Sequence, residues 1–196
     1  LRMHIAPSYG KGRPVGEAII GTMFADGDDG RIPVVAITGT NGKTTTTALA
    51  GALCRAAGKV TAVAGNISPA ALSALMTCLD AGKLPEVWVL ELSSFQLETT
   101  VSLVVDAAAV LNVSDDHLDR YAGLDDYAAA KARIFAGGGA QVLNRQDARV
   151  LAMANAVSRR LTFGVDAPAG AEDFGIDDGW LMQGRERLLA ASELAI

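Results

Sequence analysis

A glycine-containing turn followed by a lysine and four threonines has the residue types needed to hold phosphate groups. The turn has the pattern G-x-x-G-K-T and follows an apolar, strand-like run at residues 33–38. Glycines let the backbone approach phosphates, and the N–H groups that begin the next helix attract an anion. Lys43 can reach the outer phosphates, and the Thr44 hydroxyl can coordinate Mg²⁺. The predicted nucleotide site comprises Gly39, Thr40, Asn41, Gly42, Lys43, Thr44 and Thr45.

This turn is shorter than the usual phosphate-binding loop. The pattern G-x-x-x-x-G-K-[ST] would place a further glycine at position 37, which is Ile37. A turn of this length could also be a simple connection between a strand and a helix. The strand-like run before it and the helix-like segment at 45–57 favour phosphate binding.

Several polar residues fall where ligands bind in an open α/β sheet, at the carboxyl ends of the expected strands. Glu91 ends an apolar run, where a carboxylate is costly unless it is hydrogen-bonded or binds a cation. It is therefore either a Mg²⁺ ligand or a partly solvated acid at a strand end. The residues expected together at this edge are Asn66, Glu91, Ser93, Ser94, Asn112, Asp115, Asp116 and His117.

Three residues, two of them at this edge, also fit ordinary structural roles. His117 lies in an acidic cluster and fits either a second metal site or a loop or helix-capping histidine. Lys131 lies on an alanine-rich segment, so composition alone favours a solvent-facing lysine. Ser93 could cap a short helix, or it could donate to a phosphate together with its neighbours.

The elements that must position these residues alternate from Ile32 onward, which is typical of βαβ units. Expected strands lie at 33–38, 60–64, 87–92, 107–112, 141–143 and 160–163. We expect helices at 45–57, from Ser68-Pro69 to residue 79, and at 125–135. The predicted fold is α/β and P-loop-containing, with a mostly parallel sheet flanked by helices and a small antiparallel hairpin within 175–188. Residues 1–31 are expected to form a leader with one short helix near 15–23.

Composition narrows the class of protein. The net charge is −5 and no basic run occurs among the 196 residues, so we expect no nucleic-acid partner. No apolar segment is long enough to span a membrane and no signal peptide is visible, so we expect a cytoplasmic protein without membrane contact. Cys54 and Cys78 are expected to be buried free thiols in a reducing compartment.

Taken together, these motifs resemble the central ATP-binding domain of the Mur ligase family, and within it the members that add D-glutamate. The resemblance covers about residues 32–165. The residues that carry it are 38–44, 65–66, 91–98, 112–120 and 130–134.

The resemblance implies an ATP-dependent amide ligase of peptidoglycan precursor synthesis that works through an acyl phosphate, with ATP and Mg²⁺ as cofactors. It implies catalytic roles for Lys43, His117 and Lys131, with Thr44 and Glu91 near one Mg²⁺ and His117 near a second. It also implies that Lys131 is carbamylated and belongs to the metal site. Asn66, Ser93 and Gln96 match positions near the UDP-sugar–amino-acid substrate, and D-glutamate is the implied second substrate.

The resemblance also bears on what surrounds this domain. Members of this kind carry an N-terminal UDP-binding domain and a C-terminal amino-acid-binding domain, and neither fits within residues 1–31 or 32–196. We therefore expect the isolated chain to be an inactive monomer. Residues 1–31 resemble the linker that enters the ligase half of cyanophycin synthetase. A ligase domain of that type, and a stand-alone nucleotide-binding module, remain alternatives.

Overall fold

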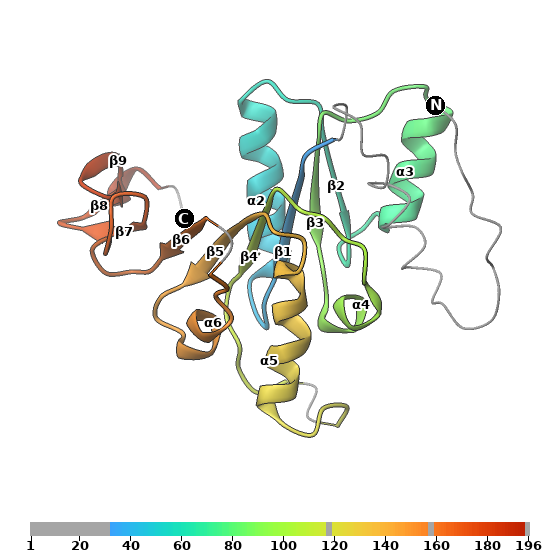
Figure 1. Ribbon diagram of the computed structural model, residues 1–196. Helices are drawn as coiled ribbons and strands as arrows, with labels where there is room; N and C mark the ends of the chain where they lie inside the picture. Colours follow the sequence, from blue (N-terminus) through green and yellow to red (C-terminus); the bar gives the residue numbers. More distant parts are fainter. Residues whose placement is uncertain (1–31, 117–118, 157–158, 195–196) are drawn as a thin grey trace.

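A computed structural model describes residues 32–116, 119–156 and 159–194 (Figure 1). The strands are β1 (Val34–Thr38), β2 (Thr61–Gly65), β3 (Val87–Glu91), β4 (Ala107–Val110), β5 (Ala140–Asn144), β6 (Arg160–Phe163), β7 (Phe174–Asp177), β8 (Trp180–Gln183) and β9 (Glu186–Ala190). The α-helices are α2 (Lys43–Ala56), α3 (Ala71–Asp80), α4 (Ser94–Thr99), α5 (Leu124–Ala132) and α6 (Ala148–Ala152). Two short 3₁₀ helices are η1 (Arg133–Phe135) and η2 (Ala191–Glu193).

All nine strands described here belong to one sheet, in the order β2-β3-β1-β4-β5-β6-β7-β8-β9. The strands from β2 to β6 pair in parallel, and β7, β8 and β9 pair antiparallel. A single parallel pair, Phe163 with Phe174, joins the two parts. The parallel order confirms the predicted mostly parallel α/β sheet.

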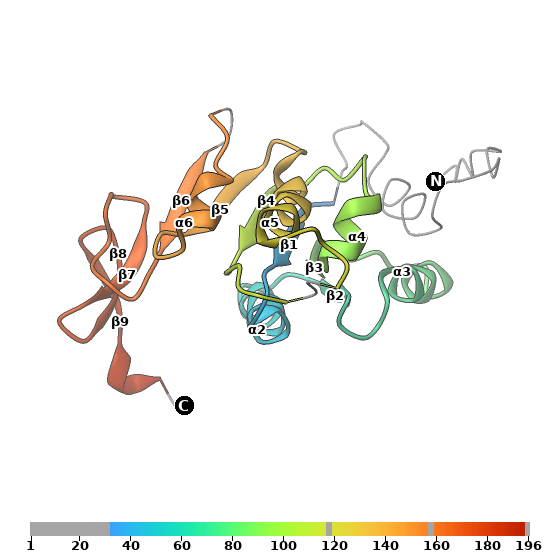
Figure 2. The ribbon, with the colours of Figure 1, turned by 90° about the horizontal axis from the view of Figure 1, so that it is seen from below.

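Helices cover both faces of the parallel part. Figure 2 shows α2 on one side of the sheet and α4 and α5 on the other. The central strands β1, β3 and β4 are thereby shielded on both faces. Their apolar side chains, among them Trp88, Leu90 and Val110, belong to the core. Burial on both faces explains why these strands are near-continuous apolar runs rather than alternating patterns. Among the described residues, no helix is long and apolar enough to cross a membrane.

Three details differ from the sequence-based expectations, and a fourth expectation falls on residues that the structure does not describe. Helix α3 begins at Ala71, with Ala70 at its N-cap, rather than at Ser68-Pro69. The antiparallel part has three strands rather than a two-stranded hairpin, because the chain after residue 183 turns back to pair with β8. Cys54 and Cys78 are free thiols, but both are only partly buried, and Cys78 packs against the edge of the core. The helix expected near 15–23 lies outside the described residues.

Candidate active site

The turn between β1 and α2 has a backbone that glycine alone accommodates easily. Gly42, the N-cap of α2, has φ 79°, in the left-handed region that L-residues rarely adopt. A Cβ atom on Gly39 would lie 2.9 Å from the Cβ atom of Leu111, at the end of β4. The two glycines in the motif therefore serve turn conformation and close packing against the neighbouring strand.

The N-terminus of α2 has the features of an anion site. No side chain caps the helix and no acidic residue lies in its first turn. The first N–H groups of a helix have no intrahelical partners, and the helix dipole adds partial positive charge there. Lys43 begins this helix, and its Nζ atom lies 2.8 Å from the carbonyl oxygen of Thr40. The arrangement therefore gathers N–H donors and one ammonium group around the turn.

Asn112, just beyond β4, stabilises the turn through side-chain hydrogen bonds. Its Oδ1 atom accepts hydrogen bonds from the backbone N–H groups of Thr40 (3.1 Å) and Asn41 (2.8 Å). Its Nδ2 atom donates to the carbonyl oxygen of Asn41, at 3.1 Å. The Thr40 hydroxyl also accepts from the backbone N–H of Ser114, at 3.1 Å. Sequence reasoning placed Asn112 at this edge but missed this supporting role. The signal that could have indicated it was the position of Asn112 at a strand end.

Glu91 links two of the other expected site residues. It is 1% exposed, and its two carboxylate oxygens accept hydrogen bonds from the Thr44 hydroxyl (2.9 Å) and from Nδ2 of Asn66 (2.8 Å). Both donors are neutral, and none of the ion pairs among the described residues involves Glu91. The interpretation of Glu91 as a partly solvated acid is therefore wrong.

These contacts fit a hard divalent cation. A buried carboxylate without a cationic partner is costly, and its oxygens retain further acceptor capacity beside the Thr44 hydroxyl. Carboxylate and hydroxyl oxygens next to phosphates are the donors that Mg²⁺ takes in proteins. Thr44 and Glu91 are therefore a suitable pair to hold Mg²⁺.

Lys131 on α5 is buried beside the turn at residues 39–44, called the phosphate turn below. Its interpretation as a solvent-facing lysine is therefore wrong. It is 1% exposed, its Nζ donates to the carbonyl oxygen of Gly39 at 2.9 Å, and it lies 4.2 Å from the centre of the Tyr127 ring. Burial lowers the pKa of the Lys131 amine to about 7, and the positive charge of Lys43 acts in the same direction. Asp116 opposes that shift. A substantial fraction of this amine is therefore neutral near pH 7.

Ser93 and Gln96 have a structural role in the described part of the chain, whereas His117 is not described. Ser93 forms a capping box with Gln96, because its Oγ accepts from the Gln96 N–H at 3.2 Å and its own N–H donates to Gln96 Oε1 at 2.9 Å. The helix-cap interpretation of Ser93 is thus confirmed, and its contact with a substrate stays a prediction. His117 lies outside the described residues. Within the described part of the chain, no group of three or more His, Cys, Asp or Glu side chains could hold a metal ion.

The mostly parallel sheet, the glycine-containing turn after β1 and the Thr44–Glu91 contact are those of an α/β domain with a P-loop-like turn. The family described as "Mur ligase middle domain" matches residues 37–180, and the chain belongs to this family.

Curated relatives point to one branch of it. A UDP-N-acetylmuramoylalanine–D-glutamate ligase from Aromatoleum aromaticum is 61% identical over 168 residues, which are 83% of this chain and 36% of that protein. The enzyme of the same name from Nitrosospira multiformis is 56% identical over 93% of this chain and 40% of its own length. The chain thus spans well under half of these relatives. A match over 93% of the chain must include part of residues 1–31, and the resemblance of that segment to cyanophycin synthetase is not supported.

Solved structures share the fold. A UDP-N-acetylmuramoyl-L-alanyl-D-glutamate–2,6-diaminopimelate ligase is similar over 84% of this chain and 38% of that chain, with a TM-score of 0.63 and 28% identity. A MurF ligase from Thermotoga maritima in complex with ADP is similar over 85% of this chain and 40% of that chain, with a TM-score of 0.62 and 20% identity. The second likeness concerns the fold alone.

Proposed function

We propose that this chain is the ATP-binding middle domain of a ligase that joins D-glutamate to UDP-N-acetylmuramoyl-L-alanine in peptidoglycan precursor synthesis. The observation that carries the proposal is the 2.9 Å contact between the Thr44 hydroxyl and the buried Glu91 carboxylate at the open N-terminus of α2. The choice of D-glutamate rests on the 61% and 56% identity to D-glutamate ligases.

The proposed reaction has two steps. A carboxylate oxygen of the UDP-sugar–alanine substrate attacks the γ-phosphorus of ATP, the bond to the β-phosphate oxygen breaks, and ADP leaves. The D-glutamate amine then attacks the acyl carbon, an amide bond forms, phosphate leaves and the amine gives up its proton. Phosphoryl transfer depends mainly on positioning and on neutralising charge. Lys43 and the N–H groups that begin α2 perform that task, with Gly39, Thr40, Asn41, Gly42 and Thr45 shaping the turn.

Thr44 and Glu91 would hold one Mg²⁺, and His117 with Lys131 would serve a second. When bound, Mg²⁺ neutralises phosphate charge and polarises the bond that breaks. Support for the first site comes from the geometry of Thr44 and Glu91, whereas the second rests on the family resemblance of the sequence.

Carbamylation of Lys131 is part of this proposal. The neutral amine attacks the carbon of CO₂, a C–N bond forms, one C–O π pair moves to oxygen and a proton is released to solvent. The lowered pKa of Lys131 supports this step, because only the unprotonated amine is a nucleophile. The product is an anion whose two oxygens suit Mg²⁺.

Asn66, Ser93 and Gln96 are proposed to lie near the UDP-sugar substrate. Asn66 already bonds to Glu91, and Ser93 and Gln96 begin the helix that follows β3. The remaining parts of the substrates would bind on domains that flank this one in a longer cytoplasmic, monomeric enzyme. The alternatives, a cyanophycin-type ligase domain and a stand-alone nucleotide-binding module, have no comparable support.

A substrate panel tests the function. Full-length ligase that contains this chain is given ATP, Mg²⁺ and UDP-N-acetylmuramoyl-L-alanine with D-glutamate, L-glutamate, L-arginine or no amino acid. We expect ADP release to depend on D-glutamate. ADP release that follows L-arginine, or that needs no amino acid, would contradict the proposal.

A further inference from the structure

Helix α4 connects the metal-binding edge of β3 to the rest of the domain, although it is only six residues long. It begins three positions after Glu91, whose backbone is also held by the pairing of β3 with β1 and β2. Isolated helices of this length are not stable in water. The capping box at Ser93 fixes the first turn locally but does not fix the helix relative to its neighbours. Tertiary contacts must therefore set the position of α4.

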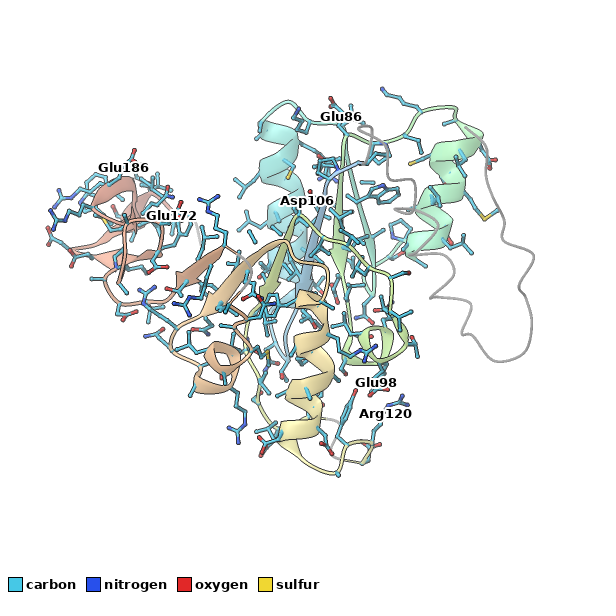
Figure 3. All side chains as sticks on the ribbon, in the orientation of Figure 1. Glu86, Glu98, Asp106, Arg120, Glu172 and Glu186 are labelled. Carbon is cyan, nitrogen blue, oxygen red and sulfur yellow. The ribbon has the colours of Figure 1, made fainter. Side chains whose placement is uncertain are left out.

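Arg120 holds the outer side of α4. Its Nη2 atom lies 2.6 Å from Glu98 Oε2, and its guanidinium carbon lies 4.5 Å from the centre of the Phe95 ring. Phe95 and Glu98 are three residues apart on α4, so one arginine contacts both on the same helix face. Figure 3 shows Glu98 and Arg120 side by side beneath α4. Tyr121 adds a stacked contact with Phe95, with ring centres 6.3 Å apart.

Arg133 holds the C-terminal end of the same helix. Its Nε atom donates to the carbonyl oxygen of Leu97 at 2.7 Å, and its Nη2 atom donates to the carbonyl oxygen of Thr100 at 3.0 Å. The last carbonyl groups of a helix lack intrahelical partners, and an arginine can satisfy them. Arg120 precedes α5 and Arg133 follows it in the chain, so their contacts attach α4 to the unit formed by α5 and its flanking residues.

That unit also carries Lys131. Lys131 is two residues before Arg133, and its Nζ bonds to Gly39 of the phosphate turn. Helix α5 thus has one set of contacts with the phosphate turn and another with the helix after Glu91. Only Leu92 and Ser93 separate α4 from Glu91, so a shift of α4 relative to α5 acts directly on the strand end that carries Glu91.

We propose that Arg120 and Arg133 are positioning residues of the ligase reaction, which clamp α4 to α5 and thereby keep Glu91 in register with Lys131. This inference rests on the proposed function. A purely stabilising role makes a different prediction for Arg120. The Arg120 side chain is 50% exposed, and ion pairs as exposed as this one contribute little to folding stability. Displacement of a catalytic group by about 1 Å, in contrast, can lower the rate on the order of 100-fold.

The test compares clamp variants with a matched control in the full-length ligase. Arg187 is the control, because it also pairs with an acid, Asp178 at 3.2 Å, and lies 5.2 Å from the centre of the Trp180 ring, but it lies on β9. We expect Arg120→Ala and Arg133→Ala each to lower kcat about tenfold or more, with KM for ATP changed less than about threefold. Arg187→Ala should stay within about twofold of wild type, and no variant should shift Tm by more than a few degrees.

Further variants separate positioning from folding. Arg120→Lys keeps the charge but loses the planar group, so we expect it to restore only part of kcat. Adding Glu98→Ala to Arg120→Ala should cost less than the two single effects combined, because both remove the same contact. If Arg133→Ala lowers Tm strongly, Arg120→Ala and Glu98→Gln decide the outcome.

The outcomes are distinguishable. If wild-type ligase shows no D-glutamate-dependent turnover, the proposed function fails and the inference fails with it. If wild type turns over but Arg120→Ala keeps kcat within about twofold, or matches Arg187→Ala, the clamp is overturned while the function stands.

Discussion

The Nζ atom of Lys131 lies 2.9 Å from the carbonyl oxygen of Gly39, although 92 residues separate them in sequence. This contact brings a buried amine from α5 to the turn that begins α2. It places Lys131 near Lys43, whose charge helps to lower the pKa of the Lys131 amine to about 7. The contact between Lys131 and Gly39 explains how α5 can serve both the phosphate turn and the proposed metal site.

The first prediction concerns Lys43. Lys43→Ala should weaken ATP binding by the isolated chain about 30-fold or more, because a charged donor to phosphate contributes roughly 2–3 kcal/mol. Titration calorimetry measures this affinity. The control is Lys59→Ala, which removes an exposed lysine just beyond the far end of α2. Equal ATP affinity in wild type and Lys43→Ala would rule out the assigned phosphate turn.

Glu91 should link nucleotide binding to Mg²⁺. Glu91→Gln preserves the size of the side chain but removes the charge that faces the Thr44 hydroxyl. We expect Mg²⁺ to tighten ATP binding by wild type at least about tenfold more than by this variant. Calorimetry with and without Mg²⁺ gives both affinities. An unchanged Mg²⁺ effect would remove Glu91 from the metal site.

The buried amine of Lys131 should make stability depend on pH. Its folded-state pKa of about 7 lies below the ordinary lysine value of 10.5, so the unfolded chain binds more protons between these values. The free energy of unfolding should therefore rise with pH through this window. Relative to Lys131→Met, wild type should gain roughly 2 kcal/mol between pH 6 and pH 9 in CO₂-free buffer, as urea denaturation can measure. Parallel pH profiles for the two proteins would contradict the prediction.

Asn112 should support the phosphate turn without contacting the nucleotide. Asn112→Ala removes an acceptor shared by the N–H groups of Thr40 and Asn41, and we expect a loss of about 1–3 kcal/mol in unfolding free energy. ATP affinity should fall as well, because the turn loses its fixed shape. Thermal unfolding and calorimetry measure the two effects. Asn155→Ala, at an exposed asparagine whose backbone N–H donates to Gln141 Oε1, serves as the comparison. Equal nucleotide affinity in both variants would contradict the supporting role of Asn112.

The isolated chain should bind nucleotide but not catalyse. We expect no D-glutamate-dependent phosphate release from the purified 196-residue chain, because it spans only 36% and 40% of the two D-glutamate ligases compared above. A coupled phosphate assay checks this. Turnover at any rate above a Lys43→Ala control would show that this chain contains a complete site.

Local features of the fold could be read directly from the chain. The strand at Arg160–Phe163 has the predicted bounds, and those of β1 and β3 differ by one residue at one end. Strands β1 and β3 are short apolar runs between turns, and such patterns are set by neighbouring residues. The start of α3 was misplaced because Ser68 and Pro69 form a typical helix beginning, whereas the structure continues the loop to Ala70. The third antiparallel strand depends on pairing with β8, which a turn pattern alone does not specify.

The sequence by itself determined the phosphate turn and the α/β alternation, because glycine conformation, helix starts and apolar periodicity are local properties. Only the tertiary structure decided that Lys131 is buried, that Asn112 supports the turn and that Glu91 meets Thr44. Those contacts join residues 92, 71 and 47 positions apart. Contacts over such separations arise when parallel strands bring their carboxyl ends to one edge of the sheet. Local sequence patterns do not show which distant residues meet there.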